Sequence, residues 1–171
     1  MIRMLLTLAV FAVLALCVLA MWLGWRGRAR RQAAVLPPLP EPPVELIDGA
    51  SELLPPASGV YVGTTTAGDW QDRIAVGDLG YRFVATLRLT DAGLLVDRVG
   101  ARPLWIPSAD LRGAHTDRAL AGKVMTRDGL LVVTWQLGEH LLDTGFRGDD
   151  KTEYAAWVVA LTSAPVSGGE A

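Results

Sequence analysis

The longest apolar run of the chain lies near its N-terminus. Met4–Trp25 contains 22 residues without a charged side chain, interrupted only by the weakly polar Thr7 and Cys17. A hydrocarbon core about 30 Å thick needs roughly 20 apolar residues of helix, and a helix pairs the backbone groups that lipid cannot satisfy. The run therefore predicts one transmembrane helix, and no other apolar run in the sequence approaches this length.

Aromatic and basic residues follow one another at the C-terminal end of this run. The residues that we expect to make the membrane-anchoring contacts are Trp22, Trp25, Arg26, Arg28, Arg30 and Arg31. Tryptophan rings favour the headgroup level, and an excess of arginine marks the cytoplasmic side. Only Arg3 and the terminal amine precede the run. Residues 1–31 are therefore predicted to be a single-pass anchor in the plasma membrane, with the N-terminus outside and the C-terminal domain in the cytoplasm.

A cleaved signal peptide or a lipoprotein leader is the alternative for the same stretch. A signal peptide has a shorter apolar region, a charged start and a small-x-small cleavage site. Here the apolar run is longer, and most of the charge follows it. Ala15-Leu16-Cys17 is similar to a lipoprotein site, although Leu16 is bulky where a small residue is required. The anchor is the favoured interpretation.

A proline-rich segment follows the anchor. Residues 32–57 contain seven of the ten prolines of the chain. Proline removes backbone donors and favours the extended polyproline II conformation. We expect residues 32–57 to be a semi-rigid linker between the anchor and a domain that covers residues 58–165.

From Ser58 onward, apolar and polar residues alternate with the period of two that is typical of strands. The predicted strands are Gly59–Ala67, Trp70–Val76, Tyr81–Thr90, Leu94–Val99, Arg102–Ile106, Gly122–Thr126, Leu130–Leu137 and Leu141–Phe146. Pro107–Leu120 is predicted to be irregular. Arg127-Asp128-Gly129 separates two strand-like runs, and an Asp-Gly pair in this position favours a tight hairpin turn.

The domain ends with a helical pattern. Asp150 and Glu153 have the spacing of a capping box, with Asp150 at the N-cap. Tyr154, Trp157, Val158 and Leu161 then follow at the spacing of one apolar helix face. Residues 166–171 are rich in glycine and are predicted to be a disordered tail. The whole pattern predicts a mainly β fold of about seven antiparallel strands, closed by one C-terminal helix.

This organisation resembles that of actinobacterial single-pass membrane proteins that carry a pleckstrin-homology-like (PH-like) domain. The resemblance rests on the N-terminal span, the proline linker, Trp105-Ile106-Pro107 before an irregular segment, and the closing block Asp128–Leu161. It implies a small bent barrel capped by a helix. The family brings no catalytic residues to assign to this chain.

Charge is distributed unevenly along the chain. Residues 1–31 carry five arginines and no acid, whereas residues 32–171 carry 11 basic and 18 acidic side chains. The negative cytoplasmic leaflet attracts juxtamembrane arginines and repels an acidic domain. A domain with this charge is a poor partner for nucleic acid.

Candidate chemistry is sparse, and we predict no catalytic, cofactor-binding or metal site. His115 and His140 occupy predicted loops without a carboxylate at ligand spacing. Asp143 is expected to pair with a neighbouring arginine. Inositol phosphates bind to basic residues of the first hairpin in PH domains, but Gly59–Val76 contains only Arg73, so phosphoinositide binding is not expected.

The sequence therefore predicts a membrane-anchored, non-enzymatic PH-like domain that acts as an interaction or scaffold module for a protein at the cytoplasmic face. One alternative is a domain that binds a lipid or a small molecule at the membrane, which clustering of Arg82, Arg88 and Arg127 on one face would favour. Another alternative is an accessory subunit of a transport or export complex.

Overall fold

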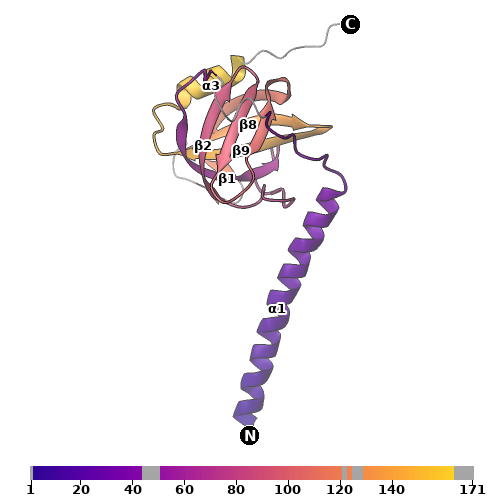
Figure 1. Ribbon diagram of the computed structural model, residues 1–171. Helices are drawn as coiled ribbons and strands as arrows, with labels where there is room; N and C mark the ends of the chain where they lie inside the picture. Colours follow the sequence, from indigo (N-terminus) through magenta and orange to yellow (C-terminus); the bar gives the residue numbers. More distant parts are fainter. Residues whose placement is uncertain (1, 44–50, 121–122, 125–128, 164–171) are drawn as a thin grey trace.

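A helix of 32 residues, α1 (Ile2–Ala33), forms the N-terminal part of the molecule. The computed structural model describes residues 2–43, 51–120, 123–124 and 129–163, and Figure 1 shows α1 extending away from a β domain. At 1.5 Å per residue the helix is roughly 48 Å long. Ile2–Gly24 is the one segment of the described chain that is long and apolar enough to cross a membrane, and its apolar window is not buried against the domain.

Seven strands form one antiparallel sheet in the order β4-β3-β2-β1-β9-β8-β5. They are β1 (Ala57–Thr66), β2 (Phe83–Thr90), β3 (Gly93–Arg98), β4 (Leu104–Pro107), β5 (Leu111–Asp117), β8 (Leu130–Leu137) and β9 (His140–Gly148). A short 3-10 helix, η1 (Ser108–Asp110), joins the two edge strands β4 and β5 and contacts β3 and β8. The sheet therefore bends back on itself, which confirms the predicted fold class of about seven antiparallel strands with a C-terminal helix.

The helix α3 (Tyr154–Ser163) covers one side of this bent sheet, where it packs on β5 and β8. The predicted apolar stripe is confirmed: Tyr154, Trp157 and Leu161 are buried in the main core. Burial of large aromatic side chains contributes strongly to stability. The core thus lies between α3 and the concave face of the sheet.

A chain of hydrogen bonds runs through this core. Trp135 Nε1 donates to Thr144 Oγ1, which is 2.8 Å from Thr64 Oγ1. The hydroxyl of Thr64 is in turn 2.8 Å from that of Tyr61, which donates to the carbonyl oxygen of Leu79. Burial raises the pKa of Tyr61 to about 12, although the hydrogen bond with Thr64 acts in the opposite direction. Each polar group in this series of hydrogen bonds, from Trp135 to Leu79, has a partner, as a stable core requires.

A second, smaller core lies outside the main cluster. Val62, Leu120, Leu130 and Val132 form it. Leu120 belongs to β6 (Ala119–Leu120), which pairs with β7 (Lys123–Val124) as a separate two-stranded ribbon. A Cβ atom at Gly145 would clash with the side chain of Leu120, so glycine allows the ribbon to approach β9 closely.

The predictions for two segments are wrong, one a predicted strand and the other a segment predicted to be irregular. Trp70–Val76 forms turns and one isolated bridge, between Thr65 and Arg73, because its backbone groups bond to the end of β1 and to side chains within the loop. The segment predicted to be irregular contains β5, which pairs with β8 and has a register shift between Leu111 and Gly113. An edge strand with mostly polar side chains has no clear alternation, so the sequence pattern did not indicate it.

The predicted hairpin before β8 is also wrong. Strand β8 pairs with β5 and β9, whereas Lys123 and Val124 pair with β6. Arg127 and Asp128 lie outside the described residues, as do residues 166–171, so the predicted tail remains a prediction.

The predicted capping box of α3 does not form. Asp150 Oδ1 accepts hydrogen bonds from the backbone nitrogen and the hydroxyl of Thr152, and these bonds lower the pKa of the carboxyl. The side chain therefore closes a turn before the helix, which begins at Tyr154.

Candidate functional site

The end of α1 meets the β domain at a junction that the sequence did not reveal. Gln32, in the last turn of the helix, donates from Nε2 to the carbonyl oxygen of Arg73 at 3.3 Å. Its Oε1 accepts from the backbone nitrogen of Ala75 at 2.7 Å. The side-chain amide thus pairs with two backbone groups of the loop between β1 and β2, much as a neighbouring strand would. This contact joins the helix to the domain directly.

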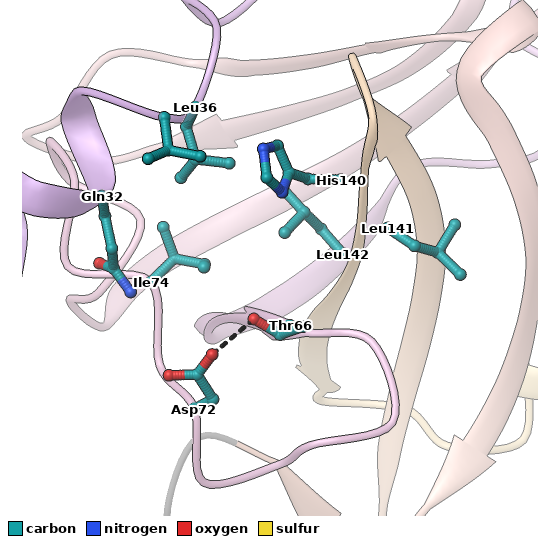
Figure 2. A pocket seen from close by; sticks show the side chains of 9 residues that line it. Gln32, Leu36, Thr66, Asp72, Ile74, His140, Leu141 and Leu142 are labelled. Atoms are coloured by element: carbon teal, nitrogen blue, oxygen red, sulfur yellow. Dashed lines mark hydrogen bonds between the residues drawn. The ribbon is translucent and has the colours of Figure 1, made fainter.

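A cavity of about 320 Å³ lies at this junction (Figure 2). Apolar side chains of the turn after α1 and of β9 form most of its wall, together with Ile74; they are Val35, Leu36, Leu141 and Leu142. Polar groups come from Gln32, His140, Thr66 and Asp72, and the hydroxyl of Thr66 donates to Asp72 Oδ2 at 2.7 Å. An apolar cavity with a few polar groups suits binding of a ligand or of a partner side chain.

The chain after α1 also packs against the domain. Leu36 and Leu39 contact the main core. Pro37 lies so close to the β8–β9 turn that a Cβ at Gly138 would be 2.7 Å from its Cγ, and Gly138 has a positive φ of +60°. Residues 36–42 line an open groove of about 970 Å³ together with Arg98 and Arg102. The described part of the predicted linker therefore contacts the domain, and the predicted domain boundaries remain predictions.

The residues that were predicted to anchor the chain are described only in part. Trp22 and Arg26 lie one helical turn apart, and the Arg26 guanidinium carbon is 5.1 Å from the centre of the Trp22 ring. The two side chains thus form a cation–π pair at the end of the apolar segment. The side chains of Trp25, Arg28, Arg30 and Arg31 lie outside the described residues, so their predicted role in anchoring remains a prediction.

Arg98 is a buried cation that the sequence analysis overlooked. Its side chain is 3% exposed, and its guanidinium donates to the carbonyl oxygens of Arg102 and Asp78. The guanidinium carbon lies 5.1 Å from the Tyr61 ring centre and 5.4 Å from that of Phe83. The alternation of side chains in the predicted strand Leu94–Val99 places residue 98 on the apolar face, and this alternation could have indicated that Arg98 is buried. Arg98 holds the start of β2 and the end of β3 together.

The structure does not gather Arg82 and Arg88 as the lipid-binding alternative would require. Arg88 Nε pairs with Glu52 Oε1 at 2.7 Å. Arg82 is exposed just before β2, six residues away along an extended chain, or roughly 20 Å at 3.3 Å per residue. Arg127 lies outside the described residues.

The candidate chemical residues lie apart from one another. His115 lies in β5 and His140 begins β9, so neither occupies the loop that was predicted, and they line different cavities. The expected pairing of Asp143 with an arginine is wrong, because the carboxylate accepts from the Thr134 hydroxyl and the Gly68 nitrogen. Within the described residues, no three histidine, cysteine or acidic side chains gather as a metal site would require.

Comparison with known families identifies the family to which the domain belongs. Residues 36–162 match the profile of a family described as bacterial PH domain-like. The matched region begins just after α1 and ends within α3, so it contains the complete bent sheet. No curated protein gave a significant match. The match covers most of the sequence and agrees with the observed fold, and the chain therefore belongs to the bacterial PH domain-like family.

Proposed function

We propose that this chain is a non-enzymatic interaction module held at the cytoplasmic face of the plasma membrane by α1. The proposal rests on the apolar surface of Ile2–Gly24, which no part of the described domain covers. A soluble protein rarely exposes an apolar surface of this extent. The arginines that follow the segment supply the orientation, because positive charge marks the cytoplasmic side.

The contact of Gln32 with Arg73 and Ala75 supports a position of the domain close to the membrane. Gln32 follows the candidate span by eight residues of helix, or roughly 12 Å at 1.5 Å per residue. A helix that is bonded to the domain so soon after leaving the bilayer keeps the domain close to the membrane and restricts its orientation. The junction cavity would then be presented next to the headgroups, where a membrane protein can reach it.

The proposed partner is a protein, and tethering supports this mode of action. A domain that is confined to one membrane meets its partner at a high effective concentration, so weak contacts suffice. A family whose fold is generally non-catalytic agrees with such a role.

Binding of a small molecule or lipid is a second candidate function, because the junction cavity of about 320 Å³ has a mainly apolar wall. This volume is at the lower end of the range for ligand pockets. Phosphoinositides are not the ligands that we propose, since Arg73 already donates from Nη1 to the carbonyl oxygen of Gly80 at 2.7 Å.

A fractionation experiment tests the anchor. We expect the full chain, with a C-terminal tag, to stay in membranes after washing with alkaline carbonate, and its intact mass to include residues 1–31. A shorter chain in the soluble fraction would support a cleaved leader and contradict the proposal. A shorter chain that stays in the membrane with a lipid on Cys17 would support the lipoprotein alternative.

A further inference from the structure

Asp143 is a buried carboxylate with no cation beside it among the described residues. It lies in β9 and is 8% exposed. Its oxygens accept from the Thr134 hydroxyl at 2.6 Å and from the Gly68 nitrogen at 3.1 Å, and both donors are neutral. No lysine or arginine in the described part of the chain pairs with it. Because charge is costly to bury, buried carboxylates are usually paired with a cation.

This carboxylate lines a cavity of about 280 Å³ on the side of the sheet that carries the smaller core. Trp70, His115 and Asp117 also line the cavity, and the described residues of its wall include no lysine or arginine. The faces of indole rings attract cations, and a tryptophan ring is the most effective of the aromatic side chains. The cavity therefore combines negative charge, an aromatic ring and a small volume.

The loop that carries Trp70 is held in place by hydrogen bonds. Gly68, with a φ of +78°, directs its N–H to Asp143, and the nitrogen of Ala67 donates to the carbonyl oxygen of Leu141. Asp69 Oδ1 accepts from the backbone nitrogens of residues 71 and 72. Because both sides of the loop are fixed, Trp70 is positioned at the cavity before any ligand enters, which reduces the entropic cost of binding.

A second polar group beside Asp143 is left without a partner. Thr65 is the register partner of Asp143 on β1, so their side chains share one face of the sheet. Among the described residues, Thr65 Oγ1 is the fully buried side-chain atom that lacks a hydrogen bond. Unsatisfied buried groups in a native structure often indicate a site for a missing ligand or water.

We infer that this cavity binds a small organic cation, with an ammonium group held between the Asp143 carboxylate and the Trp70 ring. An organic cation fits better than a divalent metal ion, because Ca²⁺ and Mg²⁺ require six or more oxygen ligands in a defined geometry. The ammonium group has two possible sources, a free amine or an amine-bearing lipid headgroup. The loop Thr66–Asp72 supplies residues to both this cavity and the one at the α1 junction, so the site lies on the part of the domain next to the anchor.

Binding of ethanolamine to the full chain tests the inference. The protein is placed in nanodiscs of phosphatidylglycerol at 0.15 M salt, which screens unspecific attraction to the anionic lipid. Ethanolamine is titrated at pH 7, where its amine is protonated, and ethylene glycol serves as the neutral probe of similar size. The indole N–H resonance of Trp70, assigned with a Trp70→Leu variant, reports binding. We expect a saturable shift with ethanolamine and none with ethylene glycol.

Variants separate a specific site from surface attraction. We expect Asp143→Asn to weaken ethanolamine binding at least tenfold, because a charge-assisted contact is lost while the shape is kept. Calorimetry, which needs no tryptophan signal, should show a weakening of about fivefold for Trp70→Leu. Asp97→Asn removes the same charge from an exposed position on β3 and should leave binding unchanged. Circular dichroism confirms that each variant is folded.

The inference is overturned if wild type shows no saturable ethanolamine binding, if ethylene glycol binds equally, or if a folded Asp143→Asn or Trp70→Leu variant binds as wild type does. Repeating the titration in nanodiscs that contain phosphatidylethanolamine identifies the source. Competition by this lipid would assign the site to a lipid headgroup, whereas unchanged binding would assign it to a free amine; both results support an ammonium site.

Discussion

The two helices of this protein carry apolar side chains to different surroundings. Helix α3 has ten residues and turns one face to the sheet, where Trp157 is 2% exposed. Helix α1 is apolar on all sides along Ile2–Gly24, and the domain covers none of that segment. Helix α3 also carries an exposed apolar residue, Val159, so the two helices differ chiefly in length: ten residues are too short to cross a bilayer, whereas the 23 residues of Ile2–Gly24 are long enough. The comparison shows that the length of an apolar helix, together with the contacts that the domain offers it, separates the two cases.

The largest effect is expected in the buried helix. Replacing Trp157 by alanine leaves a cavity between α3 and the sheet, and we expect the free energy of unfolding to fall by about 3–5 kcal/mol. Chemical denaturation of the full chain in detergent micelles measures this. Trp70→Ala is the matched control, because Trp70 is 36% exposed and should change stability by less than about 1 kcal/mol. Equal losses in both variants would show that α3 does not close the core.

The same substitution, placed in each helix in turn, distinguishes a helix in lipid from a helix surface in water. Val13 in α1 is 59% exposed and Val159 in α3 is 64% exposed. Val13→Arg places a charge in the middle of the proposed span, at a cost of about 2.5–3.5 kcal/mol, and should reduce the membrane-bound fraction. Val159→Arg should leave membrane association and stability unchanged, because that position faces water. Membrane association that tolerates Val13→Arg would contradict a spanning role for α1.

The core, unlike α1, predicts that the free energy of unfolding depends on pH in the alkaline range. Burial raises the pKa of Tyr61 to about 12, whereas the residue titrates near 10 when unfolded. Between these values the native state holds the proton and the unfolded state releases it, so stability falls as pH rises, by up to about 3 kcal/mol. Below pH 10 this contribution is fully present.

Denaturation between pH 9 and pH 11.5 checks this expectation, with Tyr61→Phe as the comparison. The phenylalanine variant should be less stable at neutral pH, because it loses two hydrogen bonds, but should depend less steeply on pH. A slope that is identical in both proteins would show that the phenol of Tyr61 ionises freely in the folded state.

The smallest effect is expected at the junction between the two regions. Gln32→Ala removes two hydrogen bonds to the loop between β1 and β2, which should lower the free energy of unfolding by about 1–2 kcal/mol. Gln71→Ala alters an exposed glutamine of the same loop and is expected to have little effect. Thermal denaturation of the full chain in nanodiscs compares the two. Equal melting temperatures would mean that α1 and the domain are joined by the chain alone.

Much of the fold was predictable because the spacing of apolar residues along the sequence matches the side chains that are buried in the structure. Tyr154, Trp157 and Leu161 formed the predicted stripe, and the apolar run that became most of α1 was evident from its length. Strand β5 was missed because its edge position does not require alternating side chains.

The sites were less predictable, because they depend on contacts between segments far apart in the sequence. Gln32 belongs to no motif, and only the folded structure brings it to Ala75. Asp143 likewise bonds to the 67–70 loop and has no cation beside it in the described part of the chain, which its sequence neighbours do not indicate.

The sidedness of the domain is the central claim, and labelling of a single cysteine tests it most directly. Cys17 is the only cysteine of the sequence, so Cys17→Ala combined with Asp97→Cys gives one reactive thiol at an exposed position of β3. The account predicts that a membrane-impermeant maleimide labels this thiol only after the cells are opened. Equal labelling in intact cells would place the domain outside and contradict the proposed cytoplasmic role.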